Sequence, residues 1–190
     1  MSRINRDIKD NFDFFQELLF ESKVVTEKEI LLAQKKSNAY WLTAECNLQH
    51  NTLEEVPVSI IIEKSNRDNK YGLKLRCSAL TAEPFFRFDS DGPAHRNDDS
   101  SIPLEEQSIT TPHFNSFDKE GRSIAYKNDT LKDEKKAEII INDIEFGTSL
   151  FCMESKCMLA DENFPKVGYK IPEINFEENK ETNFDNINFD

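Results

Sequence analysis

The sequence predicts an α+β protein with an N-terminal pair of helices, an antiparallel sheet of about five to six strands, one C-terminal helix and an acidic tail. Two observations lead to this prediction. Apolar residues recur at helical spacing in the first 38 residues, and from Tyr40 the spacing changes to the alternation that is typical of strands. We expect a single domain over residues 1–172, helical over 1–38 and sheet with one helix over 39–172, and a flexible tail over 173–190.

The helical pair rests on two local patterns. Residues 6–22 place Ile8, Phe12 and Phe15 on one face, with acidic residues on the other faces. Thr26 and Glu29 then have the spacing of a capping box, in which each side chain bonds to the backbone of the other residue. A second helix is therefore expected from Thr26 to the polar residues 35–38.

The sheet rests on alternating and β-branched runs separated by polar turns. Four strands are expected over residues 40–48, 56–63, 71–80 and 84–89. A hairpin is expected from residues 113–117 and 123–127, because Gly121 supplies the left-handed backbone of a short turn. Residues 97–108 are polar, lack a period and indicate a surface loop, and a helix is expected from Asn142 or Asp143 to Lys156.

The segment around this loop contains two of the three histidines. Gly92-Pro93 forces a turn after the fourth strand, which places His95 on a loop. Pro112 restricts Thr111 to extended geometry and begins the strand that carries His113. The two imidazoles can therefore meet at one end of the sheet.

The same residues carry a resemblance to a known family. Arg87, Asp89, Gly92-Pro93, His95 and Asn97, followed by Pro112-His113-Phe114, resemble the signature R-x-D, G-P-x-H and P-H-x-H of an uncharacterised bacterial family, most clearly over residues 58–126. A looser version of the signature occurs in TumE-type toxins. The second histidine of P-H-x-H is Asn115 in this chain, which puts in doubt any role that needs both histidines.

Three interpretations of this segment stay open. Arg87, His95 and His113 are the residue types of a metal-independent ribonuclease, in which imidazoles transfer protons and an arginine holds phosphate. Asp89, His95 and His113 are alternatively possible metal ligands. The third and favoured interpretation is structural: Arg87 pairs with Asp89, and the histidines bond to backbone carbonyls. No catalytic residue, metal or cofactor is expected under it, and the chain has neither a glycine-rich nucleotide loop nor a C-x-x-C pair.

The charge is uneven along the chain. The net charge is −12, and residues 1–80 hold 12 basic and 12 acidic residues, whereas residues 81–190 hold 12 and 24. An acidic surface repels phosphate and attracts basic partners, so we expect no direct binding to nucleic acid. No apolar run is long enough to cross a membrane, no signal peptide is visible, and the four cysteines suit a reducing compartment. We therefore expect a protein of the bacterial cytoplasm.

These features favour a non-catalytic function. We expect an acidic protein that binds and blocks a basic, nucleic-acid-handling protein, as an inhibitor of the anti-CRISPR or antidefence type from a phage or mobile element. The alternative is a TumE-like toxin with ribonuclease activity. The residues expected to contact the partner are acidic or aromatic and lie in the loop and the tail: Asp98, Asp99, Glu105, Glu106, Glu173, Glu177, Glu178, Glu181, Phe184 and Asp185.

Overall fold

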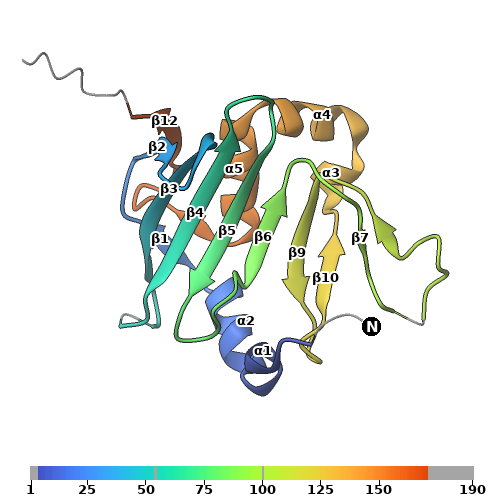
Figure 1. Cartoon of the computed structure of the whole chain (residues 1–190). Coiled ribbons are helices and arrows are strands. Elements are labelled where there is room, and N and C mark those ends of the chain that lie inside the picture. The colour runs from blue at the N-terminus through green and yellow to red at the C-terminus, as the bar shows by residue number, and fades with distance from the viewer. Residues whose placement is uncertain (1–3, 54, 100, 171–190) are drawn as a thin grey trace, which may run out of the picture.

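The structure is a computed structural model, and it describes residues 4–170 except 54 and 100. Within these residues, ten strands form one curled, mixed sheet, and two short strands form a separate hairpin (Figure 1). The fold is 23% helical and 38% strand. The prediction of a helical pair beside a sheet of five to six strands is therefore wrong, because segments near both ends of the chain join the sheet.

Six strands of the sheet form an antiparallel meander that reaches one edge, and they lie close to the ranges that the alternation predicts. It consists of β3 (Asn38–His50), β4 (Val58–Ser65), β5 (Tyr71–Cys77), β6 (Phe86–Asp89), β9 (His113–Phe117) and β10 (Ser123–Tyr126). β9 pairs with both β6 and β10, which makes β10 one edge of the sheet. The expected β9–β10 hairpin is confirmed, and Gly121 has the φ of 72° that this turn requires.

The other edge contains the strands that the sequence analysis missed. β1 (Lys23–Val25) and β2 (Glu29–Lys35) both pair antiparallel with the long β3. β11 (Cys157–Met158) joins β1, and β12 (Lys166–Tyr169) joins β2, each in parallel. These two parallel pairs make the sheet mixed.

The predicted second helix is therefore β2 instead. Ile30 and Leu32 are buried, whereas Leu31 between them is 46% exposed, so burial alternates with the period of a strand. Thr26 does not cap a helix, since its hydroxyl donates to the Asn47 carbonyl across the sheet. Pairing with β3 outweighs the local capping pattern.

The first predicted helix is present in two pieces, α1 (Arg6–Asp10) and α2 (Phe12–Phe20). The buried ammonium of Lys23 ends α2, because it donates to carbonyl oxygens of the last turn and of the residue after it. These acceptors are Leu18, Leu19 and Glu21. Burial lowers the pKa of Lys23 to about 8.

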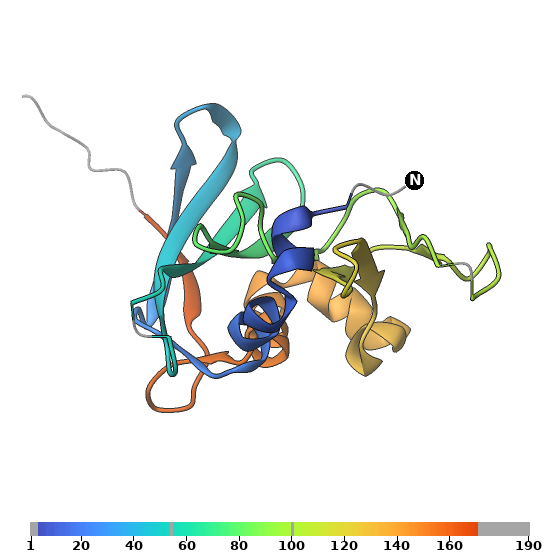
Figure 2. The same cartoon turned by 90° about the horizontal axis from the view of Figure 1, so that it is seen from below.

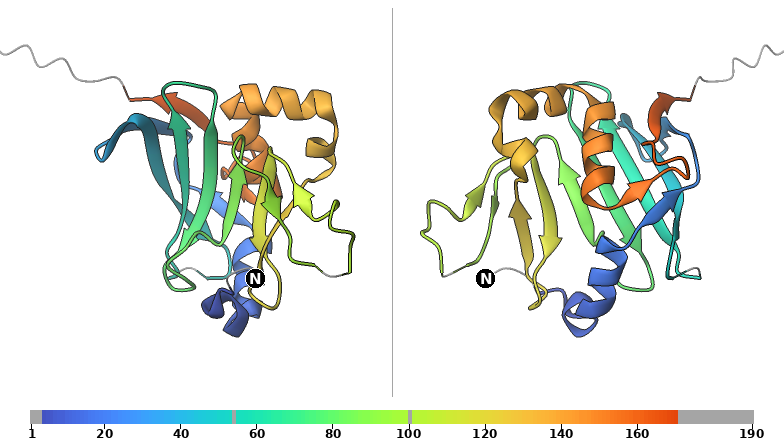
Figure 3. Two further views of the ribbon diagram at one scale, coloured as in Figure 1. Left: turned by 45° about the vertical axis from the view of Figure 1, so that its right-hand side comes forward. Right: turned by 180° about the vertical axis from the view of Figure 1, so that it is seen from behind.

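The C-terminal part contains three helices where one was predicted: α3 (Asp129–Lys132), α4 (Glu134–Asn142) and α5 (Ile144–Glu154). Each begins at a side chain that caps its first backbone amides, and these caps are Asn128, Asp133 and Asp143. The expected helix corresponds to α5, which crosses one face of the sheet (Figure 3, right).

The apolar core lies between α5 and the face of the sheet that α5 crosses. The sheet curves around this core (Figure 2). Phe86 and Phe114 stack with ring centroids 5.6 Å apart, and Phe151 of α5 lies 5.3 Å from Phe86. Because side chains alternate along a strand, burying Phe86 and Phe88 directs Arg87 and Asp89 to the opposite face.

The remaining strands, β7 (His95–Arg96) and β8 (Ser108–Ile109), pair with each other and stand out from the main sheet (Figures 1 and 3). His95 was expected on a loop but lies in β7, because residues 95 and 96 pair with residues 109 and 108. Among the described residues of the surface loop expected over 97–108, only Ser108 belongs to a strand. Across residues 4–170, apart from the two omitted positions, no helix is long and apolar enough to span a membrane. The expected tail, 173–190, lies outside the described residues.

Candidate functional site

Four polar side chains of β6 and β9 lie together on the face of the sheet opposite the core. Arg87 pairs in register with Asn115, and Asp89 pairs with His113. Residues two apart on a strand share a face, so the R-x-D spacing on β6 and the H-x-N spacing on β9 each place two side chains on this face. The register between the strands then brings the four side chains together. His113 therefore lies close to Arg87 and Asp89, with which it was grouped in the open interpretations of this segment.

The Asp89 carboxylate is the centre of this group. Its Oδ2 accepts from Arg87 Nη2 at 2.6 Å and from Asn115 Nδ2 at 2.7 Å, and His113 Nε2 lies 3.8 Å away. The expected Arg87–Asp89 pair is thus formed. One carboxylate oxygen accepts from both donors, so Arg87 and Asn115 are linked through Asp89.

His113 lies behind this pair and is only 3% exposed. Burial lowers the pKa of His113 below its usual value, and the nearby Asp89 carboxylate opposes this effect only in part. A neutral imidazole is therefore favoured, and it has little access to solvent.

His95 is held by the edge of the sheet. Its Nε2 lies 3.2 Å from the Ser123 carbonyl oxygen of β10. A carbonyl can only accept, so Nε2 carries the hydrogen and Nδ1 of the neutral ring is an acceptor. Two residues on, the Asn97 amide donates to the Ala125 carbonyl at 2.8 Å and accepts from the Ala125 N–H at 2.7 Å.

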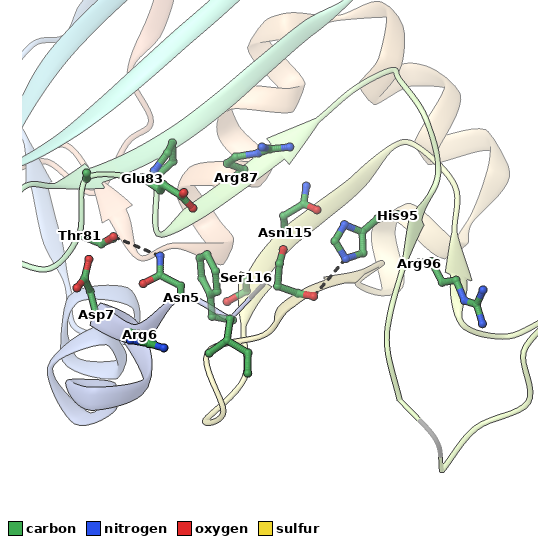
Figure 4. A pocket seen from close by; sticks show the side chains of 15 residues that line it. Asn5, Arg6, Asp7, Thr81, Glu83, Arg87, His95, Arg96, Asn115 and Ser116 are labelled. Carbon is green, nitrogen blue, oxygen red and sulfur yellow. Dashed lines mark hydrogen bonds between the residues drawn. The ribbon is translucent and has the colours of Figure 1, made fainter. Parts of the chain in front are cut away.

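Arg87, His95 and Asn115 border an open cavity of about 840 Å³, which we call the β6–β9 cleft. The charged or hydrogen-bonding residues that line it are Asn5, Arg6, Asp7, Thr81, Glu83, Arg87, His95, Arg96, Asn115, Ser116 and Ser123. Figure 4 shows His95 pointing towards Asn115 and Arg87, whereas Arg96 points away from them. His113 and Asp89 do not line the cleft.

The two histidines come near each other but not into one cavity. Their ring centroids are 6.4 Å apart and the rings are nearly perpendicular, at 75°. Across the described residues, no group of three His, Cys, Asp or Glu side chains is arranged to hold a metal ion. The alternative ligand set of Asp89, His95 and His113 is therefore not assembled, because Asp89 is bonded to Arg87 and Asn115, and His95 is bonded to Ser123.

The expected partner-binding residues fall into two groups. Asp98, Asp99, Glu105 and Glu106 are exposed on the β7–β8 hairpin. Two hydrogen bonds from Ser101 to the Asp99 carboxylate lower its pKa. The other residues lie outside the described part: Glu173, Glu177, Glu178, Glu181, Phe184 and Asp185.

Sequence reasoning missed several residues of the cleft. Arg6 was assigned only to an amphipathic helix, and Asn5, Thr81 and Ser116 were not selected at all. These residues come from separate segments and have no common spacing, so no local pattern could have identified them. Asn97 was among the residues that carry the family resemblance, but its hydrogen bonds to Ala125 of β10 could not be predicted from the sequence because they depend on the fold.

Comparisons with protein-family models, with curated proteins and with solved structures each found no match. The resemblance to the R-x-D, G-P-x-H and P-H-x-H signature stays a prediction.

Proposed function

We propose that the protein binds a phosphate-bearing ligand in the β6–β9 cleft, with Arg87 holding the anion. The state of the Arg87 guanidinium is the observation that carries this proposal. Its Nη2 is held by Asp89, its side chain is 43% exposed, and its buried Nε has no hydrogen-bond partner among the described residues. A buried N–H without a partner is unfavourable, and the exposed part of the guanidinium presents further N–H donors to a ligand oxygen.

The local charge supports the same proposal. The chain as a whole is strongly acidic, but three arginines line the cleft, against the carboxylates of Asp7 and Glu83. Arginine presents several N–H donors in one plane, a geometry that suits phosphate oxygens. Asn115 and His95 point towards this arginine, so further polar groups are within the same part of the cleft (Figure 4).

Titration of the protein with adenosine 5′-monophosphate (AMP), followed by isothermal calorimetry, tests this proposal. We expect Arg87→Gln to weaken binding by about 10- to 100-fold, because a hydrogen bond to a charged group contributes about 1.5–3 kcal/mol. Arg87→Lys keeps the charge but loses the planar donors, so it should restore only part of the affinity.

Arg67→Gln is the matched control. Arg67 lies over the Tyr40 ring, 3.4 Å from its centroid, and does not line the cleft. This variant removes the same charge and should bind AMP as the wild type does. Absence of AMP binding to the wild type, or equal weakening by Arg67→Gln and Arg87→Gln, would contradict the proposal.

Binding is favoured over ribonuclease activity because only one imidazole lines the cleft. The TumE-like alternative needs a general base and a general acid at the same phosphate. His95 Nδ1 is available as a base, but His113 is buried behind Asp89. Cleavage of labelled RNA in the presence of a chelator, abolished by both His95→Ala and His113→Ala, would instead support the alternative.

A second candidate function is the binding of a basic, nucleic-acid-handling protein, as an inhibitor of the anti-CRISPR or antidefence type. The observation that favours it is Leu104, which is 65% exposed on the projecting hairpin and directly precedes Glu105 and Glu106. An exposed apolar side chain beside acidic ones can anchor in a pocket of a basic surface.

Affinity capture from a lysate of the source organism tests this candidate. A variant with Leu104→Ser, Glu105→Lys and Glu106→Lys should lose a specific basic partner. A control with Glu134→Lys and Glu138→Lys changes two exposed acidic residues on α4 and should retain that partner. Equal capture by both variants would exclude the hairpin as the binding surface.

A further inference from the structure

The N-terminal segment forms one wall of the β6–β9 cleft, and specific contacts hold it there. The Asn5 N–H donates to the Gly121 carbonyl at 2.8 Å, and the Asn5 side chain donates to the Thr81 hydroxyl at 3.2 Å. Lys9 of α1 also pairs with Glu120 at 2.8 Å. These bonds attach the start of α1 both to the loop before β6 and to the turn between β9 and β10.

Gly121 is necessary for this attachment. Besides its positive φ, it has no room for a side chain, since a Cβ atom would lie 3.1 Å from the Lys9 Cβ and would collide with the Asn5 carbonyl oxygen. The turn can therefore approach the N-terminal segment closely only with glycine at this position.

This attachment brings a second arginine to the cleft. Arg6 is exposed and lines the cavity, and it makes no hydrogen bond or ion pair with another described residue. Arg6 comes from α1 and Arg87 from β6, and Figure 4 shows them apart within the cleft. In this view the Glu83 and Asn5 side chains lie between them, and Asn115 lies on the side of Arg87 that faces His95 (Figure 4).

We infer that the ligand of this cleft carries two phosphate groups, one held by Arg87 and the other by Arg6. This inference rests on the proposed function and specifies its ligand. Of the three arginines of the cleft, Arg96 points away from Arg87 (Figure 4) and is bonded to Gln107. Arg6 and Arg87 remain as two separate cationic groups, which are better matched by two anionic groups than by one. A nucleoside diphosphate and a short phosphorylated oligonucleotide share this chemistry.

A long nucleic acid is a poorer match than a small ligand. The exposed surface outside the cleft includes the acidic residues of the β7–β8 hairpin, which repel additional phosphates. An acidic peptide offers carboxylates in place of phosphates, and it is included in the test as a competitor. Phosphate is favoured because each group provides more acceptor oxygens for the planar donors of arginine.

The experiment compares AMP with adenosine 5′-diphosphate (ADP) and with the 5′-phosphorylated dinucleotide pApA, by calorimetry on the full chain. In the wild type, at least one of the two-phosphate ligands should bind about tenfold or more tightly than AMP, the change expected from one additional charged hydrogen bond. The tighter of the two identifies the spacing of the phosphates.

The Arg6→Gln variant distinguishes the contribution of the second phosphate group to the affinity from that of the first. This variant should weaken the two-phosphate ligand more than it weakens AMP and so reduce the advantage of the second phosphate, whereas Arg6→Lys should keep part of that advantage. Arg87→Gln should weaken all three ligands. Arg6 is exposed, so these changes are expected to leave the fold intact, which circular dichroism checks.

Three results would overturn the inference. In the first, neither ADP nor pApA binds more tightly than AMP. In the second, Arg6→Gln weakens AMP as much as it weakens the two-phosphate ligands. In the third, a peptide of four glutamates displaces ADP at equal concentration. All three differ from the failure of the proposed function, in which AMP itself does not bind.

Discussion

At the scale of single residues, Asp89 controls the chemistry of the polar side chains around it. Its Oδ2 is shared by Arg87 and Asn115, with His113 close by, so each of these groups depends on the charge of one carboxylate. Arg87 is bonded by this contact through Nη2, and its buried Nε has no hydrogen-bond partner among the described residues. Asp89 therefore acts as a positioning residue for the proposed anion site.

His113 should make the stability of the fold depend on pH. Burial lowers its pKa in the folded state, so between that pKa and the usual value of about 6.5 the unfolded chain binds more protons. The contribution of neutral His113 is complete above about pH 6.5, and it is lost as the pH falls towards the folded-state pKa.

Urea unfolding at pH 7.5 and pH 5.5 measures this effect. The free energy of unfolding should fall over this interval in the wild type, and it should fall less in His113→Gln, which does not titrate. His95→Gln serves as the control for loss of a neighbouring imidazole. An equal fall in the wild type and in His113→Gln would contradict the prediction.

Gly147 is a second residue with a clear steric role. Tyr71 donates from its hydroxyl to the Ile140 carbonyl at the end of α4, and its ring lies against Gly147 of α5. A Cβ atom at position 147 would be 2.6 Å from the Tyr71 Cζ, which is closer than a van der Waals contact.

Gly147→Ala should therefore destabilise the protein by about 1–3 kcal/mol, the usual cost of overpacking a core. Helix propensity alone predicts the opposite sign, a gain of up to about 1 kcal/mol. Tyr71→Phe removes the hydroxyl, so the double variant should cost less than the sum of the two single changes. Urea unfolding of the four proteins decides between these signs.

At the scale of elements, side chains of the β7–β8 hairpin form hydrogen bonds with the backbone of β10, the edge strand of the sheet. β10 has no neighbouring strand on its outer side in the described part of the chain. Its backbone groups at Ser123 and Ala125 are bonded instead by His95 and Asn97. Unpaired edges tend to pair with other chains, and this arrangement satisfies the edge without an additional strand.

Asn97→Ala should loosen the hairpin. The side chain makes two hydrogen bonds, so we expect a loss of about 1–3 kcal/mol in the free energy of unfolding. Amide hydrogen exchange should become faster at Ala125, whose N–H loses its acceptor. Asn66→Ala removes one exposed bond to the Ala39 carbonyl and should leave exchange at Ala125 unchanged. Unchanged protection at Ala125 in Asn97→Ala would show that the hairpin is held by other contacts.

At the scale of the whole molecule, the neutral first part and the acidic second part of the sequence do not form separate bodies. β11 and β12 come from the second part, and they pair with β1 and β2 from the first. Some acidic residues are also neutralised by neighbours in the fold. Glu63 pairs with both Lys35 and Lys74, and these pairs lower the pKa of Glu63 despite its partial burial. The uneven charge along the chain therefore does not by itself locate a binding surface.

The sequence by itself determined the strands of the meander, the β9–β10 hairpin and the shared face of Arg87 and Asp89. Each of these follows from alternation or from turn residues within a few positions of one another. Such local rules hold wherever the strand is buried on one face.

Only the tertiary structure decided that β1 and β2 pair with β3, that β11 and β12 join them in parallel, and that Arg6 lies in the same cleft as Arg87. β11 and β12 have two and four residues, too few to show a period. The physical reason is that burial and backbone pairing with distant segments outweigh weak local preferences, as the predicted helix that became β2 demonstrates.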